Sequence, residues 1–265
     1  MSAMIASLMM YQRPELAQAH DRLWLGIHER LRSAGIHAPD ALSQDAEEFF
    51  VWRHPGLILS QTCGMPYRLW LHDQVALVGT PDYGVQGCPP GYYRSAMIVR
   101  ADDTRDTVAA FKDARFAYNQ TFSQSGFASP HRHVTPLRFF FETRIQTGAH
   151  TASARAVADG TADIAALDAV TWRNLQRFEA FAKELRVLDW TSPTPGLPLI
   201  TAKGNDTEVI FAAVEGAIGA MGPEDRAVLG LQGLIRIPKA AYLNVPNPDA
   251  ALIDAVSPAA SKVDP

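Results

Sequence analysis

Hydrophobic residues near the start of the chain form two successive patterns. Residues 4–11 are mostly apolar over a short run, and this run predicts a strand. From Pro14 onward the spacing becomes helical, and the apolar positions fall on one face: Leu16, Leu23, Ile27 and Leu31. Pro14 near the start and Gly35 near the end match the usual distribution of these residues at helix boundaries. The chain is therefore expected to begin with a strand and an amphipathic helix.

Strand patterns and helical patterns alternate through the rest of the chain. Short apolar runs without alternation are typical of buried strands, and they predict strands at 56–60, 74–79, 95–100, 115–118, 162–167 and 185–189. Helical patterns lie between them, at about 136–143, 150–159, 170–184 and 206–221, with a shorter helix from Pro223. Strands that alternate with helices predict parallel α/β layers, so the expected fold class is α/β.

Composition and charge exclude several classes of protein. The 265 residues include 24 basic and 28 acidic side chains, and this acidic excess argues against a nucleic-acid binder. Hydrophobic residues make up 47% of the chain, enough to bury a core without help from disulfides or a metal. No window approaches the roughly 18 uninterrupted apolar residues that a membrane span needs, so no span is predicted.

The N-terminus and the two cysteines bear on the compartment. Residues 1–10 lack a basic region ahead of a long apolar stretch, so no secretory signal is predicted. Either the protein is cytoplasmic or the start of a precursor has been lost. Cys63 and Cys88 do not make a disulfide framework. One bridge between them in an oxidising compartment and two free thiols are both open alternatives.

The segment 118–126, which ends in Ser123-Gln124-Ser125-Gly126, is the most informative local motif. It follows the predicted strand at 115–118 and leads towards a helix. Hydroxyl side chains and glycine at such a junction expose N–H and O–H donors, which bind anions without a lysine or arginine. The alternative is that one of the two serines only caps the helix.

Further polar residues are expected at the ends of other predicted strands. Ser60, Gln61 and Thr62 end the run at 56–60, and Tyr11 ends the first strand. In an open α/β sheet, ligands bind at this carboxyl-terminal edge.

Two titratable residues join these candidates. His150 begins a predicted helix and is suited to donate to an anion, to act as a base, or simply to cap the helix. Asp168 lies at a strand end and is suited to hold a ligand ammonium group or to orient nearby donors. Ser125, His150 and Asp168 could form a hydrolytic triad, but the chain lacks the G-x-S-x-G elbow, so nucleophilic hydrolysis is not favoured. His131 and His133 lack a third ligand at useful spacing, so we expect a solvated loop there and no metal or other cofactor.

With these residues in place, the chain resembles the phosphonate-binding (PhnD-like) substrate-binding proteins of ABC transporters, which have the type 2 periplasmic-binding-protein fold. The resemblance rests on three motifs besides the strand ends: Ser-Gln-Ser-Gly at 123–126, Thr-Gly-Ala-His at 147–150, and the run from Ala156 to Ala166. It implies two α/β lobes around a ligand cleft. The first lobe would comprise residues 1–97 plus 201–265 and the second 98–200, with hinge strands near 95–100 and 198–203.

The resemblance also implies a function and a site. The expected function is non-enzymatic binding of a small oxyanion, phosphate or an organophosphonate, for delivery to an ABC permease, and the expected location is periplasmic. In such proteins the serine turn grips the oxyanion, which here means Ser123, Gln124 and Ser125, with Gln124 where threonine is often seen. His150 falls at the position of a ligand-contacting histidine, Tyr11 and residues 60–62 would face it, and Asp168 would suit an aminoalkyl group.

Two rival interpretations remain open at this point. Cytoplasmic enzymes of thiamine-precursor and menaquinone biosynthesis resemble members of the same fold. In an enzyme of that kind His150 would be the general base and Asp168 would set its tautomer. A cytoplasmic sensor that uses the same cleft is the third candidate.

Overall fold

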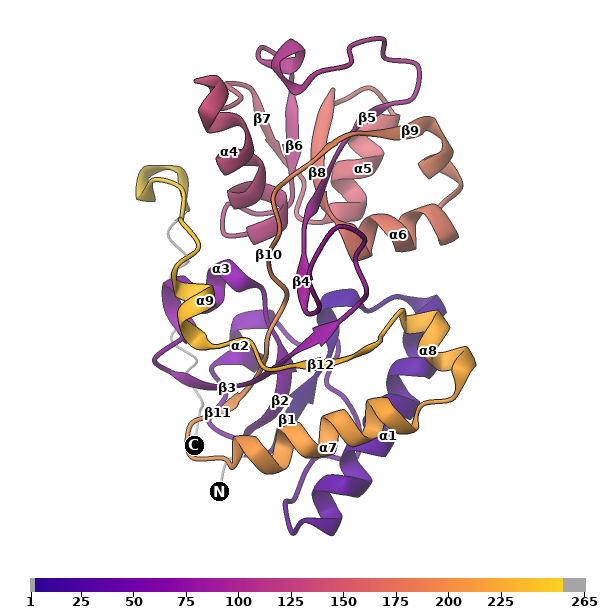
Figure 1. Cartoon of the computed structure of the whole chain (residues 1–265), viewed down its shortest axis with the longest axis vertical. Coiled ribbons are helices and arrows are strands. Elements are labelled where there is room, and N and C mark those ends of the chain that lie inside the picture. The colour runs from indigo at the N-terminus through magenta and orange to yellow at the C-terminus, as the bar shows by residue number, and fades with distance from the viewer. Residues whose placement is uncertain (1–2, 255–265) are drawn as a thin grey trace.

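Two five-stranded sheets organise the molecule, and each belongs to a separate lobe (Figure 1). A computed structural model describes residues 3–254 of the chain. The first-lobe sheet has the order β1-β2-β11-β3-β12, formed by Ile5–Ser7, Leu57–Gln61, Leu199–Ala202, Val75–Asp82 and Gly233–Ile235. The second-lobe sheet has the order β7-β6-β8-β5-β9, formed by Arg144–Gln146, Phe116–Tyr118, Ile164–Asp168, Ser95–Arg100 and Leu185–Trp190.

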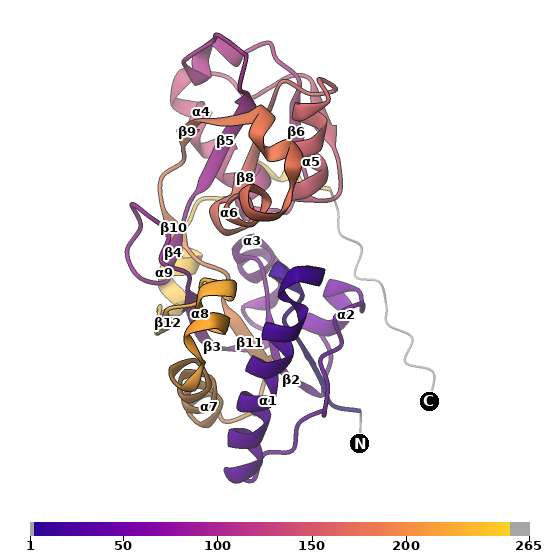
Figure 2. The ribbon, with the colours of Figure 1, turned by 90° about the vertical axis from the view of Figure 1, so that its right-hand side faces the viewer.

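Helices cover both faces of the first-lobe sheet (Figure 2). On one face, α1 and α7 pack together, joined by α8; they span Ala17–Ser33, Thr207–Ala220 and Pro223–Leu229. On the other face lie α2 and α9, which span Glu48–Trp52 and Lys239–Leu243. The short α3 (Gly64–Pro66) lies at the end of the lobe that faces the second lobe (Figure 2). Leu23 and Ile27 of α1 are buried, as the helical pattern predicts.

The second-lobe sheet is buried on both faces as well. It is covered by α5 and α6 on one side and by α4 on the other; these span His150–Ala158, Ala169–Phe178 and Ser129–Val134. In β8, Ala165 and Leu167 face α5 and α6, whereas Ile164 and Ala166 face the α4 side. A strand that is buried on both faces has no polar face, which explains why its sequence is uniformly apolar.

The sheets are mixed, which corrects the prediction of parallel layers. In the first lobe β1 and β2 are parallel, but β11 runs antiparallel to both of its neighbours. In the second lobe β6 is parallel to β7 and β8, but β5 is antiparallel to β8 and β9. The strands β5 and β11 each enter their sheet from the other lobe, and β12 is likewise antiparallel to its neighbour β3. A buried strand has the same composition in either direction, so the sequence pattern could not reveal the reversal.

Two short strands connect the lobes, β4 (Tyr92–Tyr93) and β10 (Thr194–Pro195), and they pair with each other. The crossings therefore fall slightly ahead of the predicted hinge segments, because β5 already belongs to the second sheet and β11 to the first. The division into 1–97 plus 201–265 and 98–200 stays a prediction about which parts move together.

The chain crosses between the lobes a third time near its C-terminal end. After α9, the segment shown in yellow in Figure 1 rises beside the second lobe. Leu252 packs against the second-lobe core, and Asp254 exchanges hydrogen bonds of 3.1 and 3.0 Å with Thr121. This segment therefore contacts the second lobe, although the predicted division placed it with the first.

Several predicted elements differ locally. The first strand is only β1, and Met9–Tyr11 form a 3-10 turn, η1. The predicted helix at about 136–143 is absent; the helix there is α4, so His131 and His133 are helical rather than in a loop. A turn at Thr135–Leu137 follows, and Arg138 ends it in the left-handed region with φ 62°. Within residues 3–254, no helix combines the length and the apolar character needed to cross a membrane.

Candidate functional site

A cavity between the two lobes is the candidate functional site. Its volume is about 420 Å³, and a wider cavity of about 930 Å³ shares several of its lining residues. The polar side chains that line the smaller cavity from the second lobe are Asn119, Gln120, Ser123, Ser125, His150, Asp168 and Thr171. The first lobe contributes Tyr11, Glu48 and Cys63, beside apolar Met10 and Trp52. Five of the predicted site residues, which come from distant segments of the chain, thus line this cavity together: Tyr11, Ser123, Ser125, His150 and Asp168.

The two serine hydroxyl groups of the turn have different hydrogen-bond partners. Ser123 is the N-cap of η5 (Gln124–Ala128), and its Oγ accepts a hydrogen bond of 3.0 Å from the Gly126 N–H. The capping alternative is thus the observed arrangement for Ser123. Ser125 Oγ instead lies 2.9 Å from His150 Nε2 at the cavity wall. The Ser125 hydroxyl is therefore paired with a side chain and not tied to the backbone.

Glycine at position 126 is required by close packing. A Cβ atom there would lie 2.0 Å from Asn119 Oδ1 and 3.1 Å from His150 Cε1. Because glycine has no Cβ atom, the turn, the Asn119 amide and the His150 imidazole ring can pack at van der Waals distance. Asn119 Oδ1 is buried and has no hydrogen-bond partner among the described residues. A buried acceptor without a partner costs free energy, which a donor on a ligand would recover.

His150 is the first residue of α5 and is neutral at physiological pH. Burial lowers the pKa of its imidazole to about 4, against a smaller opposing effect of the Ala166 carbonyl. A neutral imidazole carries one donor and one acceptor nitrogen, so it can donate to an anion without adding charge.

Asp168 is occupied by contacts within the protein. Its Oδ1 caps α6 by accepting from the N–H groups of Val170 and Thr171, at 2.7 and 3.1 Å. Its Oδ2 accepts a hydrogen bond of 2.8 Å from the Tyr11 hydroxyl across the cleft. Burial raises the pKa of this carboxyl to about 6. No hydrogen bond joins Asp168 to His150 among the described residues, so the arrangement in which Asp168 sets the histidine tautomer is not the one observed.

The first lobe adds a carboxyl that the sequence analysis did not identify. Glu48 is the first residue of α2 and lines both cavities. Gln120 of the second lobe donates to Glu48 Oε1 over 3.3 Å. Burial, and secondly the charge of Glu47, raise the pKa of Glu48 to about 6. Protonation therefore changes the charge of the cavity just below neutral pH.

Four predicted site residues do not line the cavity between the lobes. The Ser60 and Thr62 side chains are fully buried and approach only neighbouring backbone carbonyls. Gln61 Nε2 donates to the Leu197 carbonyl, 3.2 Å away. Gln124 points away from the cavity, donating to Ser129 Oγ and accepting from Arg68. Strand-end position alone does not decide which way a side chain points, because alternate residues face opposite sides.

Both cysteines are free thiols in the structure, so the bridged alternative is not the observed one. Cys63 is buried at the cavity, and its Sγ accepts a hydrogen bond of 3.3 Å from the Gln124 N–H. Cys88 lies in the loop before β4 and is partly exposed.

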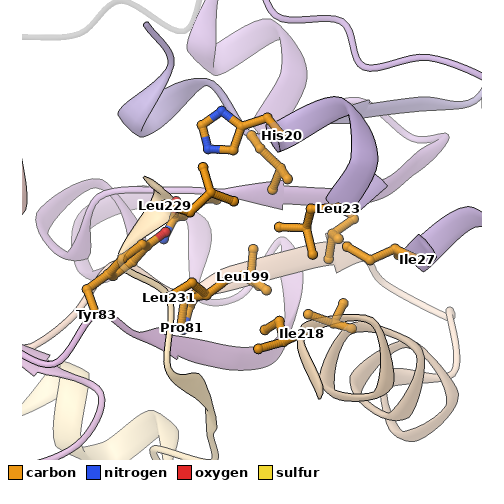
Figure 3. A pocket seen from close by; sticks show the side chains of 13 residues that line it. His20, Leu23, Ile27, Pro81, Tyr83, Leu199, Ile218, Leu229 and Leu231 are labelled. Carbon is orange, nitrogen blue, oxygen red and sulfur yellow. The ribbon is translucent and has the colours of Figure 1, made fainter. Parts of the chain in front are cut away.

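A second cavity, of about 430 Å³, lies within the first lobe between the sheet and α1, α7 and α8 (Figure 3). Leucine and isoleucine side chains form most of its wall, and His20 and Tyr83 lie at one side. An oxyanion placed here would lose its hydration without enough donors in exchange. This cavity is therefore not a candidate for anion binding.

Few basic side chains surround the cavity between the lobes. No lysine or arginine is among the described residues that line the smaller cavity. Arg13 lines the wider one, where its guanidinium bonds to Glu15 and Glu179 at 3.2 and 2.7 Å. An anion in the smaller cavity would therefore meet neutral hydroxyl, amide and imidazole groups together with the carboxyl groups of Glu48 and Asp168, and no basic side chain of the described lining.

Sequence reasoning did not assign four polar residues of this cavity to the site: Asn119, Gln120, Glu48 and Thr171. Asn119 carried the same signal as the serines, because it directly follows the predicted strand at 115–118. Thr171 lies in the first turn of α6, next to Asp168. Glu48 gave no comparable signal, since its helix follows a long irregular connection rather than a strand.

One of the comparisons with known proteins identifies a family. Residues 64–242 match the family described as "ABC transporter, phosphonate, periplasmic substrate-binding protein". No curated protein sequence matches the chain.

Solved structures share the fold at low sequence identity. PhnD1 from Prochlorococcus marinus in complex with methylphosphonate has a TM-score of 0.68 at 13% identity, over 91% of this chain and 95% of that one. A binding-protein component of an ABC phosphonate transporter from Pseudomonas aeruginosa has a TM-score of 0.66 at 16% identity, over 91% and 84%. MatC from Rhodopseudomonas palustris with bound malate has a TM-score of 0.57 at 12% identity, over 88% and 90%. These likenesses establish the two-lobed binding-protein fold.

Proposed function

The chain belongs to the phosphonate-binding family of periplasmic substrate-binding proteins of ABC transporters, and from this premise we propose that it binds a small tetrahedral oxyanion between its lobes. The proposed ligand is phosphate or an organophosphonate, and the proposed partner that receives it is an ABC permease. Five residues are proposed to contact or enclose the ligand: Tyr11, Ser123, Ser125, His150 and Asp168.

The pairing of Ser125 with His150 carries this proposal. The two side chains come from different segments of the second lobe and meet at 2.9 Å on the wall of the cavity between the lobes. Both are neutral hydrogen-bonding groups. Hydrogen bonds from such donors to an anion are shorter and about twice as strong as those between neutral groups.

Contacts between the lobes support a binding cycle of opening and closing. Tyr11 donates to Asp168, Arg13 pairs with Glu179, and Arg173 donates to the Tyr83 carbonyl. A ligand that touches both lobes would favour the arrangement in which they meet, and its release would favour opening.

A thermal-shift panel tests the proposal. Phosphate, methylphosphonate, sulfate and acetate would each be added to the purified chain. At 100 times its dissociation constant a ligand adds about 2.7 kcal/mol to the free energy of unfolding. For a chain of this size this amounts to roughly 5–10 °C in Tm. We expect the two phosphorus oxyanions to give the largest shifts.

Two variants give the test its controls. Ser125→Ala should remove most of the shift, whereas His131→Ala, on α4 and outside the cavity, should keep it. A panel in which no oxyanion raises Tm would overturn the proposal.

A further inference from the structure

Arg68 is a buried cation at the junction of three parts of the chain. It lies in η3 (Tyr67–Leu71), which directly follows α3, and Figure 2 shows α3 on the side of the first lobe that is turned towards the second. Its side chain is largely shielded, with the residue only 6% exposed. Arg68 Nη2 donates to Gln124 Oε1 of the second lobe over 2.6 Å. Nε and Nη2 donate to Asn247 Oδ1 of the C-terminal segment at 3.0 and 2.8 Å.

The partners of Arg68 are amides, so its charge is not compensated within the part of the chain that the structure describes. No carboxylate there forms an ion pair with it, and Arg132 repels it. Burial lowers the pKa of Arg68 to about 10, which leaves the guanidinium charged at neutral pH. Burying a charge without a counter-charge is costly, and proteins normally pair such groups.

The Arg68 guanidinium contacts the serine turn through the side chain of Gln124, on the side of the turn away from the cavity. Gln124, which receives the guanidinium, is the residue between Ser123 and Ser125, and its own N–H donates to Cys63 Sγ at the cavity. A Cβ on Gly64 would lie 3.5 Å from Arg68 Nη1 and 3.9 Å from Gln124 Cγ, so the two side chains pack against the same small residue. The guanidinium comes from the first lobe, whereas the turn belongs to the second. The positive charge is therefore behind the turn only when the lobes meet.

We propose that Arg68 supplies the counter-charge for the ligand and makes the site select dianionic over monoanionic tetrahedral oxyanions. This inference rests on the proposed function, because it assigns the charge class of the ligand in that same cavity. The serine turn provides the neutral donors, and Arg68 stabilises the second negative charge from behind the turn. Gln124 accepts from the guanidinium together with Asn247, which gives a reason for a long amide side chain between the two serines.

The experiment compares two probes of nearly equal shape. Methylphosphonate is mainly dianionic at pH 8.5, and its monomethyl ester is a monoanion. Isothermal titration calorimetry at low salt gives the affinity ratio of the two for each protein. The ester differs by a methyl group as well as by charge, so the informative quantity is the change in this ratio between proteins.

Two variants alter the charge, and one matched control leaves it in place. Arg68→Met removes the charge, and Gln124→Glu neutralises it with a side chain of nearly the same shape. Each should lower the preference for the dianion by about tenfold, on the order expected for one nearby buried charge. Gln124→Met breaks the same hydrogen bond but leaves the guanidinium, and should retain the preference even if both affinities fall.

The outcomes separate this inference from the function on which it rests. If Arg68→Met does not fold, Gln124→Glu alone decides the matter. If the charge-altering variants keep the wild-type ratio, Arg68 has only a structural role and the inference is wrong, while oxyanion binding stands. If the unaltered protein binds neither probe nor phosphate, the proposed function itself fails.

Discussion

The two lobes contribute side chains to the same cavity from different kinds of segment. In the second lobe, the polar residues follow strand ends or begin helices: Ser125 lies in the turn after β6, Asp168 ends β8, and His150 begins α5. In the first lobe, Tyr11 lies in a 3-10 turn and Glu48 at the start of a five-residue helix. The second lobe thus presents donors that its own backbone already positions. The first lobe adds groups whose placement depends on packing between distant segments.

This difference indicates two roles for the side chains of the cavity: some determine which ligand binds, and others determine how easily the lobes close. Groups fixed by their own lobe cost little to organise when the ligand arrives. Groups that contact the other lobe, such as Tyr11, contribute only when the lobes meet. We therefore expect changes at Ser125 and His150 to alter which anion binds, and changes at Tyr11 to alter all affinities together.

The largest effect is expected from Ser125→Ala. A hydrogen bond to a charged group contributes about 1.5–3 kcal/mol, so affinity for methylphosphonate should fall roughly 10–100-fold. Calorimetric titration measures this loss. Ser123→Ala is the matched control, because its hydroxyl caps η5. That change should cost about 1 kcal/mol of folding stability and less affinity. Equal losses of affinity in both variants would contradict the division of tasks between the two serines.

Tyr11→Phe should have a smaller and less selective effect. It removes the hydroxyl that donates to Asp168 and leaves a buried carboxyl oxygen without that partner. The closed arrangement would lose about 1–1.5 kcal/mol, so affinities for phosphate and methylphosphonate should both fall about tenfold. Titration with the two ligands measures both losses. A change confined to one ligand would show that Tyr11 acts on ligand chemistry and not on closure.

The response to pH should distinguish Glu48 from His150. The pKa of Glu48 is raised to about 6, so its contribution to stability is greatest at low pH and is lost as pH rises through 6. Glu48→Gln should therefore be more stable than the wild type at pH 7.5, by about 1 kcal/mol or 2–4 °C in Tm. This advantage should disappear near pH 4.5.

His150 should respond in the opposite direction. Its pKa is lowered to about 4, so its contribution is present above about pH 6.5 and is lost as pH falls towards 4. The stability difference between the wild type and His150→Gln should shrink on acidification. Melting curves of both variants from pH 4.5 to 7.5 supply the measurement, and parallel pH profiles for the two variants would refute the assignment.

The smallest effect is expected from Ser60→Ala. Its hydroxyl is buried in β2 and approaches only the Gln61 carbonyl, 3.4 Å away. Affinity for methylphosphonate should change by less than about twofold, equivalent to about 0.4 kcal/mol. A loss comparable to that of Ser125→Ala would place the first-lobe strand end at the ligand after all.

The sequence allowed most of the fold to be predicted, because buried strands and amphipathic helices leave periodic patterns. The uniformly apolar run of β8 and the helical spacing of α1 are examples. Strand direction left no pattern, so the reversed β5 and β11 were not predicted. The helix at 136–143 was wrong because α4 starts earlier, at Ser129, and the chain turns at Arg138.

The candidate site was predictable only where one short segment determines it. The serine turn and His150 could be located from their own sequence contexts, and the structure brings them together. Glu48 and Arg68 could not be located in this way. Their positions follow from how α2 and η3 pack beneath the second lobe, which is a tertiary property.

The third crossing of the chain has a practical consequence for optical measurements. Met4 is exposed beside the first-lobe sheet, whereas Asp254 is tied to Thr121 on the second lobe. A fluorescence energy-transfer pair attached at these two positions would carry one dye on each half of the molecule. The distance between the dyes would then follow lobe separation directly.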